Sequence, residues 1–326
     1  MNCLTRRHAI AGLAGLAAWP LARPAAAQSF PSRPIKVLVG YSPGGAVDLI
    51  ARALAEQMAP ELGQAVIVEN KPGGGTNIAI RTLIDSPADG HTLMLAANAL
   101  AANVSLYQPA PYDLARDLVP IGQAGRVPVV LAANAQAPIA SVQDLVAQLR
   151  RQPGSITYGT PGNGATPHLA IELFAHAAGV QFTHVPYKGG AQAMNDVIAG
   201  HIQTVAVNAL EVLPHARSGR LKVLAVLSDK RASIFPDTPT IAESGYPGFE
   251  ASVWYGLVGP RGLPAPVVER LHEALSHALA APAVRQRLES AGGEVTPGST
   301  ARFAALLASE QQRYEKLIRA ARIQPD

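Results

Sequence analysis

The chain has 326 residues, and 48% of them are hydrophobic, which is enough to bury a large core. Its 27 Lys and Arg residues stand against 23 Asp and Glu, without a run of basic residues, so the composition gives no support to nucleic-acid binding. A chain of this length usually divides into two domains.

The N-terminal segment has the features of an export signal. Arg6 and Arg7 precede an apolar stretch, Ile10–Leu21, which is too short to span a membrane, and the run of alanines before Gln28 offers a cleavage site. We therefore predict that residues 1–27 are removed and that the processed protein is periplasmic. The arginine pair leaves both the Sec and the twin-arginine routes open.

Removal of this segment changes the chemistry available to the rest of the chain. The segment contains three basic residues and no acidic residue, so the processed chain has a net charge of +1. It also contains Cys3, the single cysteine, which excludes disulfides and cysteine-bound metals from the processed protein. After Gln28 no apolar run is long enough for a membrane helix, so we expect a soluble protein.

Strand and helix patterns alternate in the first half of the processed chain. Ile35–Val39 is a continuous apolar run, typical of a strand that is covered on both faces, and an amphipathic helix follows it and ends at Gly63. Ala65–Val68 and Leu93–Ala96 predict two further strands, with a helix from about Thr76 between them. This βαβαβ order predicts a parallel sheet with right-handed crossovers.

A second α/β unit begins near Val127–Leu131. Its helices are predicted to begin at Ser141 and Thr166, which are good N-cap residues. Its further strands are predicted at Ile156–Tyr158, Phe182–Val185, Thr204–Val207 and Val223–Leu227.

The C-terminal part of the chain has helical patterns that need a sheet to cover. One helix is predicted to open at Pro266, and another carries Phe303 and Ile318. Packing them on the first sheet gives two lobes, each a mainly parallel sheet flanked by helices, with a cleft between the lobes. The predicted bounds are 28–131 plus 253–326 for the first lobe and 132–252 for the second.

Two glycine-rich turns, Gly40–Asp48 and Gly159–His168, each follow a strand and precede a helix. A helix N-terminus presents unpaired N–H groups and a partial positive charge, so it binds anions without Arg or Lys. Ligands in such sheets bind at the carboxyl ends of the strands. The turns therefore predict a clamp for a small carboxylated or otherwise polar solute.

These segments resemble the Bug-type extracytoplasmic solute receptors of tripartite tricarboxylate transporters. The resemblance covers essentially the whole processed chain, and its stretches occur in the family's order. They are Phe30-Pro31-Ser32-Arg33-Pro34-Ile35, Gly44-Gly45-Ala46-Val47-Asp48, Val68-Glu69-Asn70-Lys71-Pro72-Gly73, Pro87-Ala88-Asp89-Gly90-His91-Thr92-Leu93, Gly159-Thr160-Pro161-Gly162-Asn163-Gly164, His184-Val185-Pro186-Tyr187-Lys188-Gly189-Gly190 and Trp254-Tyr255-Gly256-Leu257.

The resemblance implies a type II periplasmic binding protein that closes on its ligand, binds it mostly through backbone N–H groups and small hydroxyls, and needs no cofactor. It implies a monomer that serves membrane permease subunits or a sensor. The implied ligand positions are Tyr41, Ser42, Gly44, Gly45, Asp48 and Asn98 in the first lobe, and Thr160, Gly162, Asn163, Gly164, His168, Tyr187, Lys188 and Asn208 in the second. Ala97 and Ala99, where relatives often carry hydroxyls, favour a ligand with an apolar body. Because backbone donors recognise shape and polarity and not one compound, the ligand stays open among mono-, di- and tricarboxylates, amino acids, aromatic acids and amides.

Some of these positions also have structural explanations. Asp48 can cap its own helix, His168 can be a buried histidine, and Lys188 can be a surface charge. The two uses of Asp48 and of Lys188 are left open.

Three other functions have less support in the residues. Gly40-Tyr41-Ser42-Pro43-Gly44 matches the nucleophile elbow of serine hydrolases, but Pro43 lacks the N–H that an oxyanion hole needs, so a secreted hydrolase is only the alternative. His272 and His277 are five residues apart and diverge around a helix, so they do not predict a metal site. An effector-sensing regulator would need a DNA-binding segment where the export signal stands.

Overall fold

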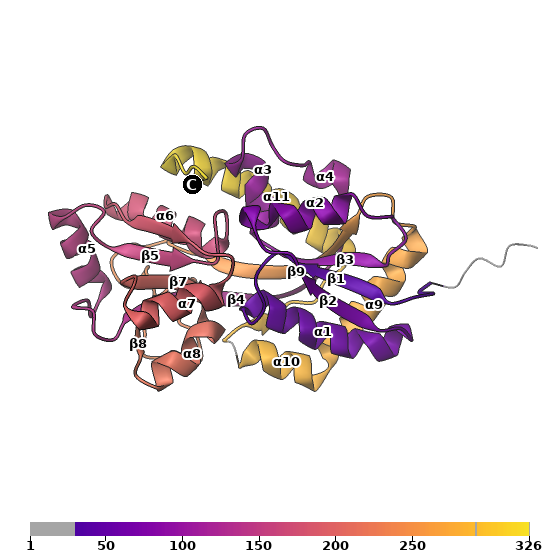
Figure 1. The fold of residues 1–326 in the computed structure, drawn as a ribbon, viewed down its shortest axis with the longest axis horizontal. Coiled ribbons are helices and arrows are strands. Elements are labelled where there is room, and N and C mark those ends of the chain that lie inside the picture. Colours follow the sequence, from indigo (N-terminus) through magenta and orange to yellow (C-terminus); the bar gives the residue numbers. More distant parts are fainter. Residues whose placement is uncertain (1–29, 291, 326) are drawn as a thin grey trace, which may run out of the picture.

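The computed structural model describes residues 30–290 and 292–325, which form a two-lobed α/β protein (Figure 1). The predicted signal, residues 1–27, lies outside the described residues. The strands are β1 (Ile35–Val39), β2 (Val66–Asn70), β3 (Thr92–Ala97), β4 (Leu118–Asn134), β5 (Thr157–Thr160), β6 (Thr183–Pro186), β7 (Thr204–Asn208), β8 (Leu221–Val226), β9 (Ser252–Pro260) and β10 (Glu294–Val295). The helices are α1 (Ala46–Leu62), α2 (Asn77–Ile84), α3 (Ala99–Leu106), α4 (Leu114–Asp117), α5 (Val142–Arg151), α6 (Thr166–Ala178), α7 (Gly190–Ala199), α8 (Ala209–Arg217), α9 (Ala265–Ala280), α10 (Pro282–Glu289) and α11 (Thr300–Ala321), with a 3-10 turn η1 (Gly74–Thr76).

One long strand, β4, belongs to the sheets of both lobes. From Leu118 to Pro128 it pairs antiparallel with β9, and from Val129 to Ala133 it pairs antiparallel with β7. The strand order is β2-β1-β3-β9-β4-β7-β5-β6, and β10 and β8 also pair with β4. In Figure 1, β4 and β9 lie at the centre, between the two groups of helices.

The sheet of the first lobe is covered on both faces, as the apolar run of β1 predicted. Val37 and Val39 pack in the core that includes α1 and α9, whereas Leu38 packs in the core that includes α2, α3 and α11. Strands β1, β2 and β3 are parallel, which confirms the predicted βαβαβ order. Figure 1 shows α1, α9 and α10 on one side of this sheet and α2, α3 and α11 on the other.

The second lobe repeats this arrangement around β5, β6 and β7, which are parallel to one another. Tyr158 of β5 packs in one core with Leu145 of α5 and Phe174 of α6. Met194 of α7 and Val212 of α8 belong to a separate core against the outer face of β4 and β7.

The run Val127–Leu131, where the second unit was predicted to begin, is where β4 changes partner from β9 to β7, but the strand itself begins earlier, at Leu118, and its first half was not predicted. Its first half contains Pro120, Gly122 and Gly125, residues that weaken a strand pattern. The structure accommodates them with two register shifts against β9, at 120/122 and 123/125. Helices α3, α8 and α10 were not predicted either.

Candidate solute-binding cleft

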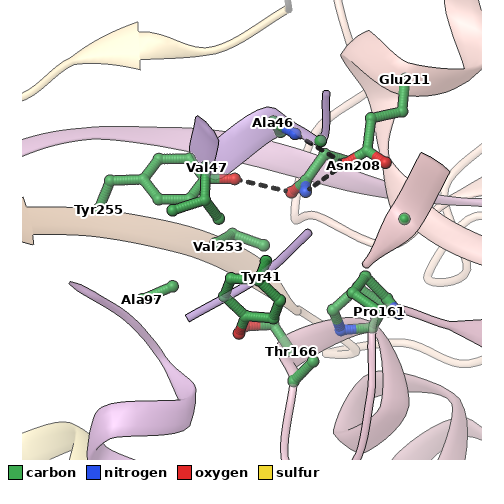
Figure 2. Close-up of a pocket in the computed structure, with 14 residues that line it drawn as sticks. Tyr41, Ala46, Val47, Ala97, Pro161, Thr166, Asn208, Glu211, Val253 and Tyr255 are labelled. Carbon is green, nitrogen blue, oxygen red and sulfur yellow. Dashed lines mark hydrogen bonds between the residues drawn. The ribbon is translucent and has the colours of Figure 1, made fainter. Parts of the chain in front are cut away.

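A small cavity lies where the two lobes meet. Its volume is about 20 Å³, room for about one water molecule. Its walls come from the turn after β1, the start of α1, the start of α6, the β7–α8 junction and β9 (Figure 2). The lining residues are Tyr41, Gly45, Ala46, Val47, Ala97, Pro161, Ala165, Thr166, Pro167, Gly190, Asn208, Glu211, Val253 and Tyr255.

The first-lobe wall is the turn between β1 and α1. Gly44 has φ of 87°, a backbone conformation that favours glycine, and Gly45 is the N-cap residue of α1 without a side chain to satisfy the free N–H groups. Tyr41 is nearly buried, and burial, helped by the charge of Glu211, raises the pKa of its hydroxyl. The turn therefore offers backbone N–H donors beside an aromatic side chain.

Asp48 stabilises this turn from behind and is not among the lining residues. Its carboxylate accepts hydrogen bonds from the backbone N–H of Gly44 at 3.0 Å, from the guanidinium of Arg52 at 2.9 and 3.0 Å, and from the amide of Asn70 at 2.9 Å. Burial raises the pKa of Asp48, but these hydrogen bonds and the Arg52 charge outweigh burial and lower it. Of the two explanations given from the sequence, capping describes these contacts.

A series of hydrogen bonds at the cavity connects two residues of the first lobe, Tyr255 and Ala46, through Asn208 and Glu211 of the second. The hydroxyl of Tyr255 donates to Oδ1 of Asn208 at 3.1 Å, and Nδ2 of Asn208 donates to Oε1 of Glu211 at 3.1 Å. The same Oε1 accepts the backbone N–H of Ala46, the first residue of α1, also at 3.1 Å (Figure 2). Asn208 is the N-cap residue of α8, yet its side chain makes no capping hydrogen bond, because its amide binds Tyr255 and Glu211 instead.

Glu211 therefore places a carboxylate where the sequence predicted a bound anion. Its other oxygen, Oε2, is buried and has no hydrogen-bond partner among the described residues. A Cβ built on Gly190, at the start of α7, would lie 1.8 Å from this oxygen, so only glycine leaves room for it. Burial raises the pKa of Glu211 more than the hydrogen bonds from Asn208 and Ala46 lower it.

A second cavity, of about 320 Å³, adjoins the first, since Tyr41 and Pro161 line both. Its other lining residues are Gly40, Gly73, Gly74, Gly75, Thr76, Tyr107, Gly162, Asn163, Pro186, Tyr187 and Lys188. The backbone N–H of Ser42 donates to the carbonyl oxygen of Lys188 at 2.8 Å, so the lobes touch beside this cavity. The hydroxyl of Tyr187 donates to Asp196 at 2.6 Å and the Lys188 side chain is exposed.

The second glycine-rich turn is held by histidines and a threonine. Oγ1 of Thr160 lies 2.7 Å from Nε2 of His184 and accepts the backbone N–H of Gly162, whose φ of 134° favours glycine. The backbone N–H of Gly164 donates to Nδ1 of His168 at 3.2 Å, and the rings of His168 and His184 stack with centroids 4.2 Å apart. Thr160 and His168 thus shape the turn from behind.

Asn98 lies in a buried network of the first lobe. Its Nδ2 donates to the hydroxyl of Tyr314 at 2.8 Å and to Glu310 at 3.2 Å, while its Oδ1 accepts the backbone N–H of Trp254 at 3.0 Å. These bonds connect the end of β3 to β9 and α11. Asn98 is not among the residues that line either cavity.

Among the predicted ligand positions, the central cavity is lined by Tyr41, Gly45 and Asn208, and the adjoining cavity by Tyr41, Gly162, Asn163, Tyr187 and Lys188. Ser42, Gly44, Asp48, Asn98, Thr160, Gly164 and His168 lie outside both linings. Which of these residues contact a solute stays a prediction.

Glu211 and Tyr255 were missed as cavity residues. Glu211 lies three residues beyond Asn208, in helix α8, which was not predicted because Pro214 lies inside it. The sequence signal for Glu211 was an acidic residue just after the carboxyl end of a predicted strand. The position of Tyr255 could have been predicted from the alternation of side chains along β9. Val253 and Tyr255 point to the cavity, whereas Trp254 between them packs on Phe303 in the opposite core.

Neither a metal site nor a membrane span is found in the part of the chain that the structure describes. It has no group of three or more His, Cys, Asp or Glu residues that could hold a metal ion. Nδ1 of His272 lies 2.9 Å from a backbone carbonyl oxygen, and His277 pairs with Glu61. Within residues 30–290 and 292–325, no helix is long and apolar enough to cross a membrane.

The model of the tripartite tricarboxylate transporter family receptor matches residues 50–323. The chain belongs to this receptor family. The receptor is 36% identical over 321 residues to protein BugT of Bordetella pertussis, with 97% of each chain covered. The family resemblance noted in the sequence is thereby confirmed.

Solved structures agree in fold. The receptor is similar to the periplasmic binding protein BugD, with 32% identity, a TM-score of 0.87 and 91% of this chain and 100% of that chain covered. It is equally similar to Rpa4515 of R. palustris with adipate, with 32% identity, a TM-score of 0.86 and the same coverage. The two-lobed periplasmic-binding-protein fold predicted from the sequence is confirmed.

Proposed function

We propose that this receptor is exported to the periplasm, where as a monomer it captures a small carboxylate-bearing solute between its lobes for uptake by a membrane permease. The observation that carries the proposal is the cavity between the lobes, which the N-terminal residues of α1, α6 and α7 line. Family membership and the adipate held by Rpa4515 support the ligand class.

Closure of the lobes is the proposed mechanism. Among the hydrogen bonds that join the lobes in the described residues, three lie at the cleft: Ser42 to Lys188, Ala46 to Glu211, and Tyr255 to Asn208. A solute that contacts both lobes favours the conformation in which these bonds form, because it binds that conformation more tightly than an open one. The closed receptor then presents to the permease a surface that the open one lacks.

We also propose that the lobes divide at 28–131 plus 253–326 and 132–252. The change of β4 partner between Pro128 and Val129 supports the first crossing, and the entry into β9 at Ser252 supports the second.

The proposal includes no catalytic activity. Ser42 of the hydrolase-like turn is followed by Pro43, which has no N–H for an oxyanion. An esterase activity lost in Ser42→Ala would contradict this part of the proposal.

The test is a thermal-shift screen of the purified protein against carboxylates and amides, after removal of any co-purified ligand. A ligand at 100 times its Kd stabilises by about 2.7 kcal/mol, which raises Tm by several degrees. X-ray scattering with the best ligand should show a more compact protein. Trp254 is unsuitable as a reporter of closure, since its indole packs on Phe303 and donates to Glu310 inside the first lobe. No stabilisation by any carboxylate would contradict the proposed ligand class.

A further inference from the structure

We infer that Glu211 selects the solute: the receptor takes a small carboxylate that carries an N–H donor group, an ammonium or an amide, and this group binds the Glu211 carboxylate in the central cavity. The inference rests on the proposed function and names the substrate class of the same site.

Three helix N-termini meet at this carboxylate. Glu211 is in the first turn of α8, its Oε1 accepts the first N–H of α1, and its Oε2 lies against Gly190, the first residue of α7. A Cβ built on Gly45 would lie 3.9 Å from the Gly190 nitrogen and 4.0 Å from Oε1, which shows how closely these ends approach. The positive potential of the three helices is therefore already matched by a negative charge of the protein itself.

A second carboxylate of the solute would meet unfavourable conditions here. The Ala46 N–H and the Asn208 amide, which would otherwise bind it, already donate to Glu211. A solute anion would also lie beside a buried carboxylate, where like charges repel strongly. The end of the solute that enters this cavity is thus not an anion.

Oε2 shows what the cavity requires instead. It is a buried carboxylate oxygen without a hydrogen-bond partner among the described residues, and such an atom is destabilising until a donor reaches it. Tyr41 and Tyr255 beside it are both buried, and the Tyr255 hydroxyl already donates to Asn208. An N–H group of the solute supplies the missing donor.

The other acid near the turn does not compete for this role. Asp48 already accepts hydrogen bonds from Gly44, Arg52 and Asn70. The carboxylate end of the solute has a separate place in the adjoining cavity, beside the backbone of Gly162 and Asn163 and near Lys188. A solute that bridges the two cavities therefore has a carboxylate at one end and an N–H donor at the other.

The experiment compares solutes that differ in one end group only. Calorimetry measures the Kd of adipate, adipic acid monoamide, 6-aminohexanoate and hexanoate, which end in a carboxylate, an amide, an ammonium and a methyl group. Shorter carboxylates with the same four end groups form a second series. We expect the ammonium or amide solutes to bind at least about tenfold more tightly than the dicarboxylates of equal length.

Glu211→Gln keeps the shape and removes the charge. We expect it to weaken binding of ammonium solutes by about 10- to 100-fold and of amide solutes by less, and to raise the affinity for dicarboxylates. The control is Glu269→Gln, an exposed acid of α9, which should change none of these ratios. The two solute series identify which donor, ammonium or amide, is used.

The outcomes separate the inference from the proposed function. Tighter binding of dicarboxylates than of N–H solutes to the wild type, or unchanged ratios in Glu211→Gln, overturns the role of Glu211 and leaves a carboxylate receptor. Binding of none of the carboxylates overturns both. The comparison of end groups on the wild type needs no variant, so it decides the question even if Glu211→Gln does not fold.

Discussion

The carboxylate of Asp48 accepts a hydrogen bond from the backbone N–H of Gly44, four residues before it, at 3.0 Å. The same side chain binds both Nε and an Nη atom of Arg52, one turn further along α1. Asp48 thus fixes the turn that presents the first N–H groups of α1 to the cleft.

Asp48→Asn should therefore destabilise the receptor by about 1–3 kcal/mol, because it removes the charge that pairs with the half-exposed Arg52 and leaves the Gly44 N–H poorly paired beside the buried side chain at 48. Chemical denaturation at pH 7 measures this. The control is Asp85→Asn, because Asp85 also pairs with an arginine one turn away, Arg81, but both side chains are exposed. This variant should lower the free energy of unfolding by less than about 0.5 kcal/mol.

The pH dependence gives a second check on Asp48. Its pKa is lowered in the folded protein, so its stabilisation is present above the unfolded value of 3.8 and is lost as the pH falls below it. The stability difference between wild type and Asp48→Asn should shrink in that acid range. A difference that does not depend on pH would contradict the ionic role.

Asn163→Asp should weaken carboxylate binding more than folding. The change puts a negative charge in the second turn, beside the backbone of Gly162 and the cavity proposed for the solute carboxylate. We expect at least about a tenfold rise in Kd with a change of stability below about 1 kcal/mol. Gln136→Glu, an exposed site of the second lobe, controls for net charge. Equal affinities in the two variants would show that this turn does not bind the carboxylate.

Asn98→Leu should act on stability and not on ligand choice. The side chain of Asn98 makes buried hydrogen bonds to Tyr314, Glu310 and the backbone of Trp254, so its loss leaves several buried polar groups unpaired. We expect a loss of about 2–4 kcal/mol in the free energy of unfolding. The ratio of affinities for any two ligands should stay as in the wild type, and a changed ratio would return Asn98 to the ligand site.

The sequence predicted the two-lobed α/β fold because strands such as β1 are apolar runs followed by a glycine-rich turn and an amphipathic helix. It failed in the first half of β4, where Pro120, Gly122 and Gly125 hide a strand that is maintained by pairing with β9 and β10. Helix α3 was not predicted because its own residues are small or apolar on every face, so its sequence has no amphipathic pattern.

The cleft was harder to predict than the fold. The turns at Gly44 and Gly162 were found, since their positive φ angles need glycine, and glycine is visible in a sequence. The contact between Ala46 and Glu211 was not, because it joins residues 165 positions apart and exists only where the lobes meet. No local pattern records such a contact.

His184 should make the receptor less stable in mild acid. Burial lowers the pKa of its imidazole from 6.5 to about 4, so the folded state keeps it neutral. Between these values the unfolded chain binds more protons than the folded one, and the stabilisation present above pH 6.5 is lost as the pH falls. At pH 5 this loss is roughly 2 kcal/mol.

The variant His184→Gln removes the titration and can still reach Thr160, whose Oγ1 lies 2.7 Å from Nε2 of His184. Other ionisable groups lie near His184: His168 stacks on its ring, and Glu172 and Arg322 line a surface cavity with it. The contribution of His184 is therefore the difference in pH dependence between the variant and the wild type. Denaturation at pH 7.5 and pH 5 should show that His184→Gln loses less unfolding free energy between these two pH values than the wild type does. His201→Gln, at an exposed histidine, should lose as much as the wild type. Equal losses in all three proteins would mean that another group causes the acid sensitivity.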